Sequence, residues 1–105
     1  MKLVIANDHA AVDLKFAILE HLKERGIEVV NIGTDTKERY QYPLAGYRAA
    51  KMVASGEADG GVLICGTGIG ISLAANKVKG IRAAVCSEPY SAKMAREHNN
   101  ANMIA

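Results

Sequence analysis

The sequence has few cysteines, no long apolar run and almost no excess of charge, and each absence excludes a class of protein. Two cysteines in 105 residues are too few for a disulfide-stabilised scaffold. No run of about 20 apolar residues is present, so we expect no membrane-spanning segment. The first residues also lack the basic and apolar regions of a secretory signal. The 13 basic and 11 acidic side chains leave a net charge of +2, which argues against a non-specific nucleic-acid binder.

What the sequence does contain is enough apolar material for a folded core. Half of its residues are hydrophobic, which argues against a disordered chain. A chain of 105 residues is expected to form one domain, residues 1–105. Folding at this size hides roughly two-thirds of the surface of the unfolded chain, so a core can form without disulfides or metal.

Short apolar, β-branched runs alternate with segments of helical character. We predict strands at residues 2–6, 27–32, 60–65, 81–85 and 102–105. Between them we predict helices at residues 12–25, 43–55, 71–78 and 89–98, the first from Val12, Phe16, Leu19 and Leu22 at helical spacing. This alternation predicts an α/β fold, a three-layer αβα Rossmann-like sandwich with a parallel five-stranded sheet.

In open α/β sheets, ligands bind beyond the carboxyl ends of the strands, so the loops at that edge are the candidate site. The most informative loop is residues 65–70, Cys-Gly-Thr-Gly-Ile-Gly. Glycines at alternate positions let the backbone turn sharply and approach a ligand, and the following helix points free N–H groups at an anion or oxyanion. The loop matches neither a P-loop nor the dinucleotide fingerprint, and a plain strand-to-helix turn is the alternative.

Cys65 ends the third predicted strand and precedes a helix N-terminus, which favours the reactive thiolate. The alternative is a small buried core residue, as most free cysteines are. Cys86 also ends a strand, but no glycines follow it, so a structural role is favoured there.

Asp8 and His9 follow the first strand and could bond a hydroxyl group and meet an anion, although such a pair is often only a helix cap. His98 ends the last helix, where a histidine often simply complements the helix dipole, and we interpret His21 as structural. The cysteines and histidines do not have the spacing of a zinc site, so we expect no metal.

Six short motifs occur in order along the chain. They are residues 7–10 (Asn-Asp-His-Ala), 42–43 (Tyr-Pro), 65–72 (Cys-Gly-Thr-Gly-Ile-Gly-Ile-Ser), 74–77 (Ala-Ala-Asn-Lys), 80–83 (Gly-Ile-Arg-Ala) and 98–102 (His-Asn-Asn-Ala-Asn). This combination resembles the type B ribose-5-phosphate isomerases, the family that also contains allose-6-phosphate isomerase and the subunits of galactose-6-phosphate isomerase. The resemblance covers essentially the whole chain.

The resemblance implies interconversion of ribose 5-phosphate and ribulose 5-phosphate through an enediolate, a reaction of the pentose phosphate pathway in carbohydrate metabolism. It implies that Cys65 moves the proton between C2 and C1. Part of the family has a Glu at the position of Ile71. The isoleucine side chain cannot accept a proton, so the resemblance assigns this role to Cys65 here. It further implies that Thr67 and His98 open the furanose ring, and that no metal or organic cofactor is needed.

The same resemblance implies the substrate-binding residues. The backbone amides of Gly66, Gly68 and Gly70 would hold the enediolate with help from Asn99. Asp8 would bond a sugar hydroxyl, His9 would help to hold the phosphate and Tyr42 would line the site. Gln41 stands where the family has Asp, and Ala11 and Val12 stand where it has Gly and Phe, which bears on substrate preference.

Family members continue past the position of Ala105 into a stretch whose arginines hold the phosphate and a helix that helps to form the dimer. We expect none of Arg39, Arg48, Arg82 and Arg96 to take the place of those arginines. The resemblance also implies a cytoplasmic homodimer or homotetramer whose sites draw residues from two chains, with no nucleic-acid partner. Two alternatives stay open: an isomerase of allose or galactose 6-phosphate, and a sugar-phosphate-binding module without turnover.

Overall fold

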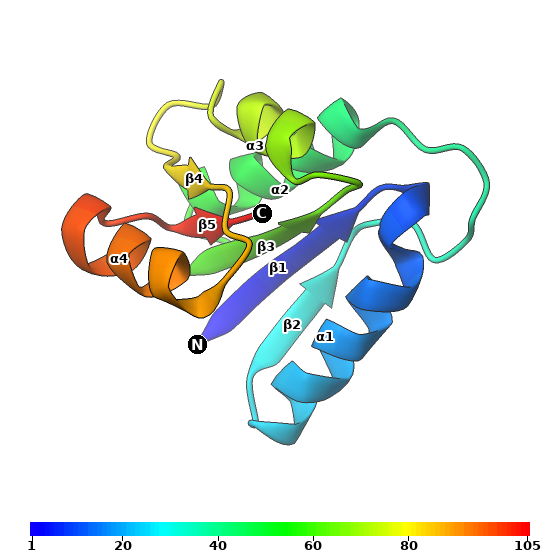
Figure 1. Cartoon of the computed structure of the whole chain (residues 1–105), viewed down its shortest axis with the longest axis horizontal. Helices are drawn as coiled ribbons and strands as arrows, with labels where there is room; N and C mark the ends of the chain where they lie inside the picture. Colours follow the sequence, from blue (N-terminus) through cyan, green and yellow to red (C-terminus); the bar gives the residue numbers. More distant parts are fainter.

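The computed structural model describes residues 1–105 and contains one parallel sheet with helices on both faces (Figure 1). Its strands are β1 (Lys2–Asn7), β2 (Glu28–Asn31), β3 (Gly60–Ile64), β4 (Ala83–Ala84) and β5 (Met103–Ile104), in the spatial order β2-β1-β3-β5-β4. Helices α2 (Tyr42–Ala54) and α3 (Ile69–Ala75) lie on one face, and α1 (Val12–Glu24) and α4 (Pro89–Asn99) lie on the other. The predicted αβα architecture is confirmed.

The larger part of the core lies between the sheet and the α2–α3 face. Val4 and Leu63 point from β1 and β3 toward Ala49 of α2 and Ile71 of α3. Small residues let the two helices approach closely, and a Cβ on Gly46 would lie 2.6 Å from the carbonyl oxygen of Ile71. This packing fixes α3, and with it the glycine loop that precedes the helix.

Helix α1 differs from the sequence prediction on its inner face. Phe16, one of the residues that set the helical spacing, is 45% exposed, whereas Lys15 has no exposed surface. Val12, Lys15, Leu19 and Leu22 follow one another at intervals of three or four residues. Position 15 therefore lies on the same face of the helix as these apolar residues, the face that packs on the sheet. Lys15 was not predicted to lie on this face, because a lysine is rarely buried without a partner.

Strand β4 is shorter than the predicted residues 81–85. It lies at the edge of the sheet, where the side chain of Asn76 makes the hydrogen bonds that a further strand would otherwise make. The Asn76 amide accepts from the Ala83 N–H at 2.8 Å and donates to the Ala83 carbonyl at 2.9 Å. This pair satisfies the outward-facing backbone groups of Ala83 at the exposed edge. No helix of the structure combines the length and the apolar character that crossing a membrane requires.

Candidate active site

The carboxyl ends of β1 and β3 lie side by side, because Asn7 pairs with Ile64 in the parallel ladder. Asp8 follows β1 and Cys65 follows β3, so two residues 57 positions apart meet at one edge of the sheet. A cavity of about 240 Å³ at this edge is lined by Asp8, Tyr42, Cys65, Gly66, Thr67 and Gly70. Six of the ten predicted site residues are therefore together within one chain.

Cys65 is half-buried, and its sulfur accepts a hydrogen bond from the Gly68 N–H at 3.2 Å. Gly68 can point its amide back at the thiol because its φ is +79°, a conformation that glycine adopts without strain. An amide that donates to sulfur is suited to hold the thiolate, the form that accepts protons. The loop thus orients Cys65 with its own backbone.

In the glycine loop, some backbone N–H groups donate hydrogen bonds within the chain and others have no partner. The Gly68 N–H is bound to Cys65, and the Ile69 N–H donates to the Thr67 hydroxyl oxygen at 3.1 Å. The N–H groups of Gly66, Thr67 and Gly70 have no partner within the chain. The predicted cradle is therefore smaller than the whole loop, since Gly68 holds the thiol instead.

Asp8 lies in the wall of the cavity and is only 7% exposed. One carboxylate oxygen accepts from the Ala10 N–H at 3.0 Å and caps the short 3-10 helix His9–Ala11. The other oxygen makes no hydrogen bond within the chain. Asp8 is thus a helix cap, which was one of the two roles expected from the sequence. Its second oxygen is still available to accept a hydrogen bond from a substrate hydroxyl. Tyr42 lies opposite, where its ring packs directly against Gly70.

His9 lines a neighbouring cavity of about 530 Å³ together with Asp8 and Tyr42. Its Nδ1 accepts from the backbone N–H of Tyr40 at 3.1 Å. An acceptor at Nδ1 assigns the ring proton to Nε2, so Nε2 is a hydrogen-bond donor on a ring that lines this cavity. This orientation suits a phosphate oxygen.

His98 and Asn99 do not join this cluster within one chain. Helix α4 starts after β4 and ends before β5, and both strands are parallel to β3. The helix therefore returns the chain to the amino-terminal edge of the sheet, opposite Cys65. There His98 is exposed, and the Asn99 carbonyl accepts from Arg82 at 3.0 Å. The roles of His98 and Asn99 remain predictions.

Cys86 has surroundings different from those of Cys65. Its thiol donates to the Ala84 carbonyl at 3.6 Å, outside both cavities. Burial, with a smaller contribution from the charge of Glu88, raises the pKa of Cys86 above its ordinary value. The protonated thiol is then favoured, which fits the structural role expected for this residue.

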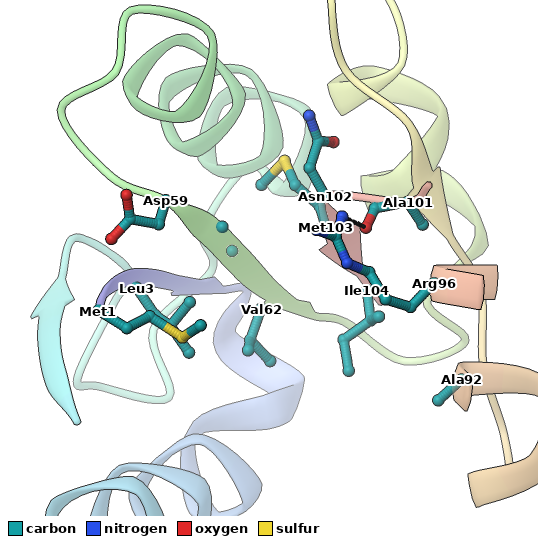
Figure 2. A pocket seen from close by; sticks show the side chains of 12 residues that line it. Met1, Leu3, Asp59, Val62, Ala92, Arg96, Ala101, Asn102, Met103 and Ile104 are labelled. Carbon is teal, nitrogen blue, oxygen red and sulfur yellow. Dashed lines mark hydrogen bonds between the residues drawn. The ribbon is translucent and has the colours of Figure 1, made fainter. Parts of the chain in front are cut away.

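Another cavity, of about 260 Å³, lies at the opposite end of the strands (Figure 2). Leu3, Val62 and Ile104 line its floor from β1, β3 and β5, and Arg96 of α4 lies at its side. None of the predicted substrate-binding residues reaches it. No three His, Cys, Asp or Glu side chains of the structure are grouped as metal ligands would be.

Comparisons with known proteins identify the family of the chain. Residues 3–105 match the family described as ribose/galactose isomerase. The chain is 55% identical over 104 residues to ribose-5-phosphate isomerase B of Escherichia coli, which covers 99% of this chain and 70% of that protein. It is 51% identical over 105 residues to the galactose-6-phosphate isomerase subunit LacB of Clostridium acetobutylicum, covering 100% of this chain and 61% of that protein.

Solved structures give the same result. Ribose-5-phosphate isomerase B of Clostridium thermocellum superposes with a TM-score of 0.98 at 54% identity, covering 100% of this chain and 71% of that chain. The chain therefore belongs to the ribose/galactose isomerase family, and the predicted family resemblance is confirmed.

Proposed function

We propose that this chain is an aldose-ketose isomerase that interconverts ribose 5-phosphate and ribulose 5-phosphate. The observation that carries the proposal is the cavity in which the Cys65 sulfur, unpartnered loop amides and the Asp8 carboxylate lie together. The 55% identity to a ribose-5-phosphate isomerase B supports the choice of substrate.

The reaction needs a base that moves one proton between adjacent carbons. The Cys65 thiolate would take the proton from C2 of the open-chain aldose and return it to C1, while the hydroxyl proton passes from O2 to O1. Ile71, at the position where part of the family has Glu, is fully buried and has no acidic group. We therefore assign the base to Cys65, as the family resemblance implies, and assign Asp8, whose carboxylate also lines the cavity, to a sugar hydroxyl.

The enediolate formed between the two proton transfers carries negative charge on oxygen. The unpartnered N–H groups of Gly66, Thr67 and Gly70 are donors that could bind it without first breaking a bond within the protein. The free oxygen of Asp8 would accept from a sugar hydroxyl, and the ring of Tyr42 would form the opposite wall.

Ring opening requires a proton to move between the ring oxygen and the anomeric hydroxyl. We propose Thr67 and His98 for this step, with Asn99 assisting the enediolate. Because His98 lies at the other edge of its own sheet, a second copy of the chain would supply it. The protein is accordingly proposed to act as a homodimer, or as a homotetramer built from such dimers.

The cytoplasm is the proposed location, because both cysteines are free and the proposed reaction needs the Cys65 thiol reduced.

A six-carbon sugar phosphate is the second candidate substrate. The observation that favours it is the 51% identity to a galactose-6-phosphate isomerase subunit. Comparing kcat/KM for ribose, allose and galactose phosphates separates the two candidates, and we expect the highest value for ribose 5-phosphate.

The proposed base is tested by Cys65→Ala, with Cys86→Ala as the matched control. We expect ribose 5-phosphate conversion to fall at least about a hundredfold in Cys65→Ala and to stay within twofold in Cys86→Ala. Circular dichroism of both variants checks the fold. Full activity of a folded Cys65→Ala variant would remove Cys65 as the base.

A titration of the wild type with ribose 5-phosphate by calorimetry accompanies the assay. Binding without conversion would instead support a sugar-phosphate-binding module without turnover.

A further inference from the structure

Two cavities meet at the carboxyl edge of the sheet, and they share Asp8 and Tyr42 as a common wall. The smaller one contains Cys65 and the glycine loop, and the larger one extends over residues 37–41. A sugar phosphate likewise has two different ends, a carbonyl end that reacts and a phosphate end that does not. If the reacting carbons lie at Cys65, the phosphate extends into the larger cavity.

The larger cavity carries the positive charge that a phosphate needs. Lys37 and Arg39 line it beside His9, whose Nε2 is a donor. Lys37 is paired with Asp13 at 3.3 Å, whereas Arg39 takes part in none of the ion pairs of the chain. A guanidinium group offers two parallel donors that match two phosphate oxygens. Arg39 is thus the cation of this cavity that is free to receive an anion.

The loop that carries Arg39 is anchored on both sides of it. Before Arg39, the Thr34 carbonyl accepts from the buried Lys15 ammonium at 2.6 Å and from the Asn7 amide at 3.0 Å. Lys15 also forms an ion pair with Asp35. After Arg39, the Tyr40 N–H is bound to His9. These bonds hold residues 34–40 against the site, which lowers the entropy lost when the loop binds a ligand.

We propose that Arg39 binds the phosphate of the substrate together with the Nε2–H of His9, and so selects phosphorylated sugars. This inference rests on the proposed isomerase function. Arg39 would act as a binding residue, distant from the carbons that exchange the proton. The proposal departs from the expectation, drawn from the sequence, that Arg39 does not take the place of the phosphate-binding arginines; position 39 lies in a loop without periodicity, so its place beside His9 could not be read from the sequence.

The test is Arg39→Gln, with Arg48→Gln as the matched control. Arg48 is exposed on α2 and lines neither cavity, so the control makes the same change in charge elsewhere. We expect KM for ribose 5-phosphate to rise about tenfold in Arg39→Gln, with kcat within twofold, as the loss of one charge-assisted contact predicts. In Arg48→Gln both constants should stay within twofold.

Inorganic phosphate provides the second measurement, because it needs no turnover. Its dissociation constant, measured by calorimetry, should rise by a similar factor in Arg39→Gln and stay unchanged in Arg48→Gln. An active wild type whose KM and phosphate affinity do not change in Arg39→Gln would overturn the proposal for Arg39 and leave the isomerase function intact.

If the wild type shows no conversion of any sugar phosphate, the proposed function fails, and the phosphate titration still decides the role of Arg39. Weaker phosphate binding by Arg39→Gln then supports the subsite. Equal binding by the two variants, or none by the wild type, removes it.

Discussion

At the scale of one residue, the buried charge of Lys15 holds in place a loop that borders the candidate site. Its ammonium group has no exposed surface and is bound by the Asn31 side chain, the Thr34 carbonyl and the Asp35 carboxylate. Burying an ammonium group without such partners would cost several kcal/mol, so its acceptors must be in place when the core forms. Two of those acceptors, Thr34 and Asp35, belong to the loop that leads to Tyr40 beside His9, and core formation therefore also positions the loop.

Asp35 gives this network a measurable dependence on pH. Hydrogen bonds from Lys15 and then from Asn31 lower the pKa of Asp35 below its ordinary value of 3.8. Because the folded state holds the carboxylate more strongly than the unfolded chain does, the stabilisation is present above pH 3.8 and is lost as pH falls through the lowered pKa. Asp35→Asn should therefore lower the unfolding free energy at pH 6 and weaken its decline below pH 4.

Urea unfolding at a series of pH values between 6 and 3 measures this effect. The effect should be modest, because the Asp35 side chain is 58% exposed and solvent screens the pair. Glu20→Gln, which removes an exposed carboxylate without a partner on α1, is the control and should follow the wild type. Parallel curves for the wild type and Asp35→Asn would show that the pair contributes nothing to stability.

At the scale of elements, the contact between α2 and α3 depends on one missing side chain. A residue other than glycine usually stabilises a helix interior, and Gly to Ala alone is worth about 1 kcal/mol in favour of Ala. In Gly46→Ala, however, the new Cβ would lie 2.6 Å from the backbone oxygen of Ile71, which is too close for any Cβ contact. We therefore expect a net destabilisation of about 1–3 kcal/mol.

Urea unfolding of Gly46→Ala beside Arg48→Ala tests the contact, since Arg48 is exposed on the same helix and should change stability by less than about 0.5 kcal/mol. A Gly46→Ala variant more stable than the wild type would mean that α2 and α3 can separate at no cost. Because α3 follows the glycine loop directly, the same variant should also reduce turnover.

The elements were largely predictable from periodicity, and their ends were not. Each predicted strand and helix is present, because apolar runs and helical spacing are local properties of the chain. The outer edge of strand β4 is bound at Ala83 by the Asn76 side chain, a tertiary contact that no local pattern reports. The free and occupied amides of the glycine loop depend on where Cys65 points, and so they too required coordinates.

The same distinction applies to the site. The alternation of elements predicts a parallel sheet, which places the loops of Asp8 and Cys65 at the same edge, and the structure shows that β1 and β3 are neighbours there. Arg39 reaches the site on a loop whose course is set by tertiary hydrogen bonds, among them the one from Lys15 to Thr34, which spacing cannot predict. His98 is set apart by the direction of α4, which the alternation of strands and helices already implies.

At the scale of the whole molecule, the direction of α4 makes a prediction about two chains. If a site combines Cys65 of one chain with His98 of another, then Cys65→Ala and His98→Ala are each inactive as pure proteins. A mixed dimer of the two variants contains one site with both residues intact. Equal mixing with free exchange of subunits should therefore restore about one quarter of the wild-type activity, because half of the dimers are mixed and each has one intact site in two.

The matched control replaces His98→Ala by the double variant Cys65→Ala/His98→Ala, which contains no intact Cys65 and should restore nothing. Light scattering at the assay concentration must give a mass of at least twice the 11.2 kDa of one chain. A dimer that exchanges subunits but stays inactive would mean that no site is shared in this way. High activity of the pure His98→Ala variant would instead remove His98 from the reaction. Activity that is recovered only in the mixture would assign Cys65 of one chain and His98 of the other to the same site.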